Sequence, residues 1–233
     1  MSDTMRLGLV GATGLVGRAV MEACIGREDV RLGAIARREV PLPKGARMEL
    51  FVAEPDKWDE VIEALQPRAM ICALGTTWKK AGEDEAAFRA VDQDLVMQVA
   101  TAAHRQGVER FVLISAVGAD AHSSNFYLKV KGEVERDVRK IGFPRFDVLR
   151  PGLLRGARAN DRRPAERLGI VLAPLVNLFL HGGYRRYRAV EDKTVARAAI
   201  AFAKRAARGR FAHEYDAIVK AAASLPALSD PQG

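Results

Sequence analysis

Short apolar runs alternate with longer amphipathic stretches along the first 150 residues. The runs are rich in Val, Ile, Leu and Phe, and several are hydrophobic at nearly every position, which is typical of strands buried on both faces of a parallel sheet. We expect strands near 5–10, 30–36, 47–52, 69–74, 110–114 and 145–149, and helices near 15–26, 57–65, 84–106 and 124–140. The alternation predicts an α/β fold, a Rossmann-type doubly wound parallel sheet.

After residue 150 the regular alternation ends. The chain continues with an Arg- and Pro-containing stretch, an apolar run at 169–180, a GGYRRYR segment and an Ala-rich helix near 191–208. Late insertions commonly wall the crevice beyond the carboxyl ends of parallel strands. We therefore expect one domain over residues 1–233, with residues 151–225 as a small C-terminal substrate lobe.

The apolar run at 169–180 contains Pro174 and has only about a dozen residues, too few to span a bilayer. We interpret it as a core or subunit-contact segment, with an interfacial membrane segment as the alternative. No membrane span is expected.

A glycine-rich turn follows the first strand directly and leads into an apolar helix. Its sequence is GATGLVG, a GxxGxxG spacing. Glycines here permit a tight turn, bring backbone N–H groups against a pyrophosphate and let the helix pack close to the sheet. The spacing alone is weak, but its position after the first strand favours dinucleotide binding over a plain structural turn. The expected contacts are Gly11, Thr13, Gly14, Leu15, Val16 and Gly17.

The end of the second strand indicates which dinucleotide is bound. An NAD enzyme normally offers a carboxylate there to the ribose 2′-hydroxyl, but this chain offers Arg37 and Arg38. Guanidinium groups bind a 2′-phosphate through charge-assisted hydrogen bonds. We predict NADP(H) as the cofactor; the alternative is a solvated strand end. The loop of Leu74, Gly75 and Thr76, after the fourth strand, is a further expected cofactor contact, although a plain turn fits it almost as well.

A Ser, a Tyr and a Lys make up the candidate catalytic group. Ser115 ends the fifth strand, and Tyr127 and Lys131 share one face of the following helix because they are four residues apart. A phenol is a poor proton donor near neutral pH unless its anion is stabilised, and an ammonium group supplies that stabilisation. Tyr127 and Lys131 are also expected cofactor contacts, since Lys131 can reach the nicotinamide ribose hydroxyls. Ser115 can donate a hydrogen bond to a substrate carbonyl. Lys129 is expected to point elsewhere; a solvated helix face is the alternative reading.

Several motifs together resemble one family. GATGLVG, IARR, LGTTWKKAG, ISAVGADAHSSNFYLKVKGEVE and LRPGLL are similar to the atypical short-chain dehydrogenase/reductases, within them the subgroup that includes the Tat-interacting oxidoreductase-like protein. The resemblance covers most of residues 5–200. It implies NADPH binding, Ser115, Tyr127 and Lys131 as the hydride-transfer residues, and backbone contacts to the nicotinamide from Pro151, Gly152, Leu153 and Leu154. Asp92 stands nearest to the position where the broader superfamily has an Asn for a proton relay, which puts the relay in doubt.

Composition and charge indicate which kinds of molecule the protein binds. The chain has 233 residues, 48% hydrophobic and 28% charged, and can bury a core. Residues 1–150 hold 22 Lys and Arg against 22 Asp and Glu, whereas residues 151–233 hold 15 against 7, so the net charge of +8 belongs to the second part. The basic residues, at 155–167 and 185–188, suggest an anionic substrate, partner or surface at the mouth of the pocket. No recognition helix or aromatic platform supports nucleic-acid binding.

The cysteines and histidines bear on the cellular compartment and on metal binding. Cys24 and Cys72 lie in apolar stretches, as expected of buried thiols in a reducing compartment, and the start of the chain does not read as a signal peptide. We therefore predict a cytoplasmic protein. The four histidines lack metal-ligand spacing, so no metal is assigned.

These residues together predict an NADPH-dependent short-chain reductase that transfers hydride to a small carbonyl or activated double bond, with Tyr127 as proton donor. The alternative is an NADPH-binding regulatory or scaffold protein with little or no turnover. A monomer or a homodimer is expected.

Overall fold

The computed structural model of the chain describes residues 4–156 and 182–226. The apolar run at 169–180 and nearly all of the basic stretch at 155–167 lie outside the described residues.

Seven parallel strands form one sheet in the order β3-β2-β1-β4-β5-β6-β9. The strand order reverses direction between β1 and β4, as in doubly wound folds, so the predicted Rossmann-type fold is confirmed. The strands are β1 (Met5–Val10), β2 (Val30–Ala36), β3 (Glu49–Val52), β4 (Ala69–Cys72), β5 (Arg110–Ile114), β6 (Arg145–Leu149) and β9 (Gly209–His213).

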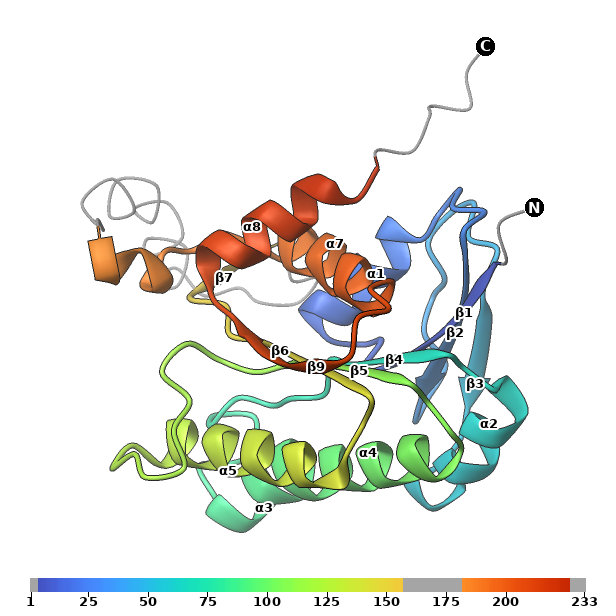
Figure 1. Cartoon of the computed structure of the whole chain (residues 1–233). Coiled ribbons are helices and arrows are strands. Elements are labelled where there is room, and N and C mark those ends of the chain that lie inside the picture. Colours follow the sequence, from blue (N-terminus) through green and yellow to red (C-terminus); the bar gives the residue numbers. More distant parts are fainter. Residues whose placement is uncertain (1–3, 157–181, 227–233) are drawn as a thin grey trace.

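Helices cover both faces of this sheet (Figure 1). One layer contains α1 (Leu15–Ala23), α7 (Asp192–Ala203) and α8 (Tyr215–Ser224). The other contains α2 (Trp58–Leu65), α3 (Glu85–Arg89), α4 (Leu95–Arg105) and α5 (Phe126–Ile141). β1, β4, β5 and β6 are buried at most or all positions, which agrees with the near-continuous hydrophobicity of the first three; β6 is also buried, although it contains Arg145 and Asp147.

Shorter elements complete the fold. These are the 3₁₀ turns η1 (Pro55–Lys57) and η3 (Gly182–Tyr187), the π turn η2 (Ala90–Asp94), and β7 (Leu154–Arg155) paired with β8 (Val190–Glu191). The helix expected near 84–106 therefore consists of α3, η2 and α4. No helix among the described residues is long and apolar enough to cross a membrane.

Local signals explain how α5 begins and ends. The Asn125 side chain accepts a hydrogen bond from the Leu128 N–H at 3.0 Å, and Gly142 closes the helix with φ +96°. Arg139 and Lys140 lie in its last turn, where positive charge is favourable to the helix dipole.

The described residues after β6 belong partly to the Rossmann layers and partly to a small separate group of elements. α7, α8 and β9 belong to the layers of the Rossmann fold, and α7 packs against α1. Among the described residues, a separate substrate lobe is therefore limited to β7, β8 and η3. That residues 151–225 form the substrate side stays a prediction.

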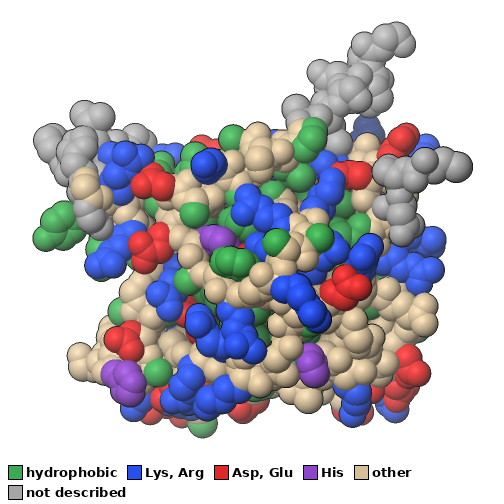
Figure 2. Space-filling model, viewed as in Figure 1, with side chains coloured by type: hydrophobic (Ala, Val, Ile, Leu, Met, Phe, Trp, Pro, Cys, Tyr) green, Lys and Arg blue, Asp and Glu red, His purple; other side chains and the backbone are tan. Residues whose placement is uncertain are grey.

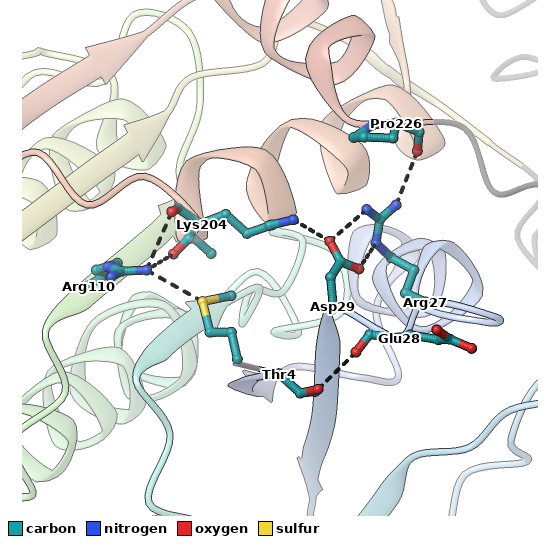
Figure 3. Close-up of polar contacts among 9 residues, drawn as sticks. Thr4, Arg27, Glu28, Asp29, Arg110, Lys204 and Pro226 are labelled. Carbon is teal, nitrogen blue, oxygen red and sulfur yellow. Dashed lines mark hydrogen bonds and ion pairs between the residues drawn. The ribbon is translucent and has the colours of Figure 1, made fainter. Parts of the chain in front are cut away.

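Polar contacts secure α7 at the amino ends of the strands (Figure 3). Arg110, at the start of β5, donates to the carbonyl oxygens of Ala203 and Lys204 at 3.2 and 3.4 Å, which satisfies the C-terminus of α7. The Lys204 ammonium pairs with Asp29, which also binds the Arg27 guanidinium at 3.0 Å. This network lies at the opposite edge of the sheet from the predicted site.

Candidate functional site

The loops that carry the predicted site residues follow the carboxyl ends of β1, β2, β4, β5 and β6. Because all these strands are parallel, the loops meet at one edge of the sheet. The loops after β1 and β4 touch through their backbones, since a Cβ atom on Gly11 would lie 2.5 Å from the Ala73 carbonyl group. Only a glycine at position 11 allows this approach.

The loop from Gly11 to Gly17 has the form of a phosphate cradle. Gly11 has φ +94°, its carbonyl oxygen accepts from the Gly14 N–H at 2.9 Å, and Gly14 is the N-cap of α1. The cap makes no side-chain hydrogen bond, and the first turn of α1 contains no acidic residue. Its N–H groups and positive dipole end suit a pyrophosphate, so the residues fit a dinucleotide.

The remaining loop residues differ in exposure. Thr13 is exposed at the turn, Leu15 is half-buried, and Val16 and Gly17 are buried. Thr13 is thus open to a ligand, whereas Val16 belongs to the core.

Arg37 and Arg38 directly follow β2 and are both exposed. Neither forms an ion pair with the part of the chain that the structure describes. Their guanidinium groups are available to a 2′-phosphate, and their part in cofactor choice stays a prediction.

α5 carries the predicted Tyr and Lys side by side. Lys131 is buried with 7% exposure, Tyr127 is 37% exposed, and the Lys131 Nζ lies 6.0 Å from the Tyr127 ring centroid. Lys129 is exposed, as the helical spacing requires. The phenol can therefore reach a ligand while the ammonium group lies behind it.

A buried carboxylate pairs with Lys131. Asp92, fully buried on η2, has Oδ1 2.7 Å from the Lys131 Nζ, and its Oδ2 accepts from the Thr76 N–H at 2.7 Å. Burial disfavours the ammonium form, but Asp92, with smaller contributions from Tyr127 and Cys72, offsets this, and the pKa of Lys131 is raised. Lys131 therefore stays charged.

The Ser115 hydroxyl points to a different partner. It donates to Glu135 Oε1 at 2.5 Å, and the Arg150 guanidinium also binds the buried Glu135 carboxylate. Because a serine has a single O–H, donation to a substrate requires its release from Glu135. The role of Ser115 toward a carbonyl stays a prediction.

The loops after β4 and β6 lie at the same edge. Leu74 and Thr76 are half-buried and Gly75 is exposed; a Cβ on Gly75 would lie 3.4 Å from Asp92 Oδ1 and 3.6 Å from the Lys131 Nζ. This loop therefore borders Lys131 and its partner Asp92.

In the segment after β6, two carbonyl groups bind the protein itself. Pro151 accepts from the Val117 N–H and Leu153 from the Val190 N–H, both at 2.9 Å. Backbone contacts to a nicotinamide are thus left to Gly152, Leu154 and the remaining atoms of the segment.

An aromatic cluster of Trp78, Phe88 and Phe126 lies next to Tyr127. The Trp78 and Phe126 rings meet edge to face at 5.3 Å, and the buried Phe88 ring lies 5.6 Å from Phe126 and 5.8 Å from Tyr127. Trp78 is 38% exposed and extends this surface to solvent.

The sequence predicted the site residues better than it predicted the residues that contact them. Glu135, Arg150 and the contact between Asp92 and Lys131 were not predicted. Glu135 follows Lys131 by four residues, and this spacing on one helix face was the available signal.

The basic residues at 185–188 lie mainly in η3. Arg185 pairs with Asp216 at 2.7 Å, and the Arg186 guanidinium lies 5.0 Å from the Tyr187 ring centroid. Figure 2 shows Lys and Arg side chains spread over much of one face of the molecule. The basic residues that are concentrated in the second part of the sequence thus do not stand out as a single positive patch on this face.

The amino-acid sequence matches known proteins over most of its length. A family described as NAD(P)H-binding matches residues 11–169. Protein fmp52, mitochondrial, of Aspergillus niger is 36% identical over 202 residues, 83% of this chain and 85% of that protein. The Fmp52 proteins of Saccharomyces cerevisiae and Candida albicans are 38% and 31% identical, over 67% and 93% of this chain and 69% and 98% of their own lengths.

Solved structures share the fold at low identity. A putative NAD-dependent epimerase/dehydratase from Bacillus halodurans has a TM-score of 0.66 at 18% identity, covering 95% of this chain and all of that one. A UDP-glucose 4-epimerase from Thermotoga maritima with UDP-glucose has a TM-score of 0.68 at 12% identity, over 90% of this chain and 77% of that one. These similarities concern the fold alone.

The relatives correct the predicted location. All three Fmp52 proteins are named mitochondrial, so the expectation of a cytoplasmic protein is wrong. The prediction rested on two thiols that are indeed buried, and burial raises the pKa of Cys24 to about 12 and of Cys72 to about 11. Protonated, buried thiols are compatible with any compartment, so they could not carry that conclusion.

The glycine cradle, the parallel sheet and the matched sequences agree, and the chain belongs to the NAD(P)H-binding family together with the Fmp52 proteins.

Proposed function

We propose that this protein is an NADPH-dependent reductase of the short-chain type that acts on a small carbonyl or an activated double bond. The observation that carries the proposal is the Tyr127 phenol, partly exposed in front of a buried, charged Lys131. The pair lies at the sheet edge that also holds the glycine cradle. The resemblance to the atypical short-chain dehydrogenase/reductases, and to their Tat-interacting subgroup, supports the same activity.

Each residue has a defined task in this proposal. NADPH, when bound, supplies the hydride. Tyr127 donates the proton to the substrate oxygen, and the positive charge of Lys131 stabilises the phenolate that remains. Gly11, Gly14 and the N-terminus of α1 hold the pyrophosphate.

The preference for NADPH over NADH rests on Arg37 and Arg38. Both are exposed at the end of β2, where a carboxylate would repel a 2′-phosphate and two guanidinium groups attract it. The substrate is a small molecule, and the arginines of η3 favour one with negative charge.

The test combines turnover with cofactor binding. NADPH oxidation is followed against a panel of aldehydes, ketones and quinones, for the unmodified chain and for Tyr127→Phe. We expect Tyr127→Phe to lose turnover by about a hundredfold or more while its NADPH dissociation constant changes little. A fully active Tyr127→Phe would refute the role of the phenol, and equal dissociation constants for NADPH and NADH would refute the cofactor preference.

One contact favours a second candidate, a regulatory or scaffold protein that binds NADPH without turnover. The Ser115 hydroxyl donates to Glu135, so it does not offer its hydrogen to a substrate. Tight NADPH binding with no turnover across the whole panel would support this second function.

A further inference from the structure

Asp92 is the most completely buried acidic side chain near the site. It lies on η2, the π turn between α3 and α4, and has 0% exposure. A π turn widens the helix by one residue, and such turns are frequent at functional positions. Asp94, two residues further along the same turn, is exposed.

The two oxygens of Asp92 meet two different parts of the site. Oδ2 accepts from the backbone N–H of Thr76, in the loop after β4, at 2.7 Å. Oδ1 has no hydrogen bond of good geometry within the described residues, and its charge is met by the Lys131 ammonium group 2.7 Å away. One carboxylate thus joins the expected cofactor loop to the expected catalytic helix.

We infer that Asp92 is a positioning residue: its carboxylate keeps the Lys131 ammonium group charged and in place, and fixes the Thr76 loop against it. The consequence for turnover rests on the proposed function, whereas the effect on Lys131 itself does not. Both oxygens face N–H donors, the Thr76 backbone and the Lys131 ammonium group, so the carboxylate is placed to accept and to pair with charge.

A negative charge at this place is needed because Lys131 is buried. The groups that face its ammonium are Asp92 from η2, Tyr127 from α5 and Cys72 from β4. Burial raises the pKa of the Cys72 thiol to about 11, so this group is neutral near neutral pH. Among the described residues, Asp92 is therefore the counter-charge that offsets the cost of burying an ammonium group.

An Asn at this position would preserve the shape and one hydrogen-bond acceptor, but it would remove the charge. Without this charge, the cost of burial weighs more heavily on Lys131 and favours its neutral form. A neutral Lys131 would no longer stabilise a phenolate on Tyr127.

The decisive experiment titrates Lys131 in the full chain without cofactor. Lysine side chains are labelled with ¹⁵N and ¹³C, their resonances are followed by NMR from about pH 7 to about pH 12.5, and Lys131→Arg assigns the signal. In the unmodified chain we expect Lys131 to titrate above its ordinary pKa of 10.5. In Asp92→Asn it should titrate lower by about one pH unit or more, and in the matched control Asp94→Asn it should not move.

Turnover supplies a second readout. In Asp92→Asn the alkaline limb of the pH profile of kcat/KM should move to lower pH, whereas Asp92→Glu, which retains the charge, should largely restore it. An unchanged Lys131 titration in Asp92→Asn would overturn the inference. If that variant does not fold, a Lys131 that titrates below 10.5 in the unmodified chain overturns it equally. A chain with the expected Lys131 titration but no turnover would contradict the proposed function and leave this inference standing.

Discussion

Gly17 offers a sharp test of how the cofactor loop is built. A Cβ atom at this position would lie 2.1 Å from the Gly11 carbonyl oxygen, 2.7 Å from the Gly11 carbonyl carbon and 3.0 Å from the Ala12 Cα. These are backbone atoms, so no side chain can rotate away. Gly17→Ala therefore has to push α1 and the glycine loop apart by about 1 Å to reach ordinary van der Waals distance.

The displacement has two expected costs. Overpacking of this kind destabilises a fold by about 1–3 kcal/mol, which for a chain of this length lowers Tm by about 2–12 °C. The same movement takes the loop N–H groups away from the pyrophosphate, and we expect the NADPH dissociation constant to rise at least about tenfold, or ~1.4 kcal/mol. Thermal unfolding by circular dichroism and NADPH titration by fluorescence measure the two effects.

Gly142→Ala is the matched control. Gly142 has φ +96°, and a Cβ there would have nothing within 4 Å, so the substitution costs only about 1–2 kcal/mol of backbone strain at the end of α5. It should lower Tm without changing NADPH affinity. The reasoning fails if Gly17→Ala binds NADPH as tightly as the unmodified chain.

Two further predictions concern ion pairs. Glu135→Gln should lower the free energy of unfolding by about 1–3 kcal/mol in urea denaturation, because it weakens the contacts of a buried carboxylate to Ser115 and to the Arg150 guanidinium. Equal stability of the variant and the unmodified chain would show that the ion pair between Glu135 and Arg150 is dispensable. For Asp29, burial opposes ionisation, but hydrogen bonds from Arg27 and Lys204 lower its pKa from 3.8 to about 2. The ionised Asp29 should contribute about 1 kcal/mol to the free energy of unfolding after allowance for solvent screening, and this contribution should be present above pH 3.8 and lost as pH falls toward 2. Asp29→Asn should therefore be less stable than the unmodified chain near pH 6 and equal to it near pH 2. A constant difference in stability over this range would contradict the assignment.

The sheet core could be predicted well because its strands are buried on both faces. β5 and β6 have the expected bounds, since each carries Phe, Val and Leu between clear breaks, although β5 begins with Arg110 and β6 contains Arg145 and Asp147. β9 was missed because it is an edge strand that begins at Gly209 and is mostly exposed, so it lacks that pattern. α8 follows it and was missed as well.

The candidate site was predictable where local spacing governs it. Tyr127 and Lys131 share a helix face because they are four residues apart, and the structure buries the second behind the first. The ion pair from Lys131 to Asp92 joins elements far apart in the chain, and it depends on a π turn that no apolar period reveals. The bond from Ser115 to Glu135 depends in the same way on tertiary packing.

The packing of α7 on α1 has a consequence for synthesis of the chain. The apolar face of α1, which includes Val16, Ala19 and Val20, is covered by residues of α7, such as Ala196 and Ala199. The glycine loop leaves the ribosome before residues 192–203 do, so α1, the helix that supports it, is covered only when α7 has followed. A nascent chain that stops before α7 therefore exposes this surface, and the packing that supports the glycine loop is complete only once residues 192–203 have been made.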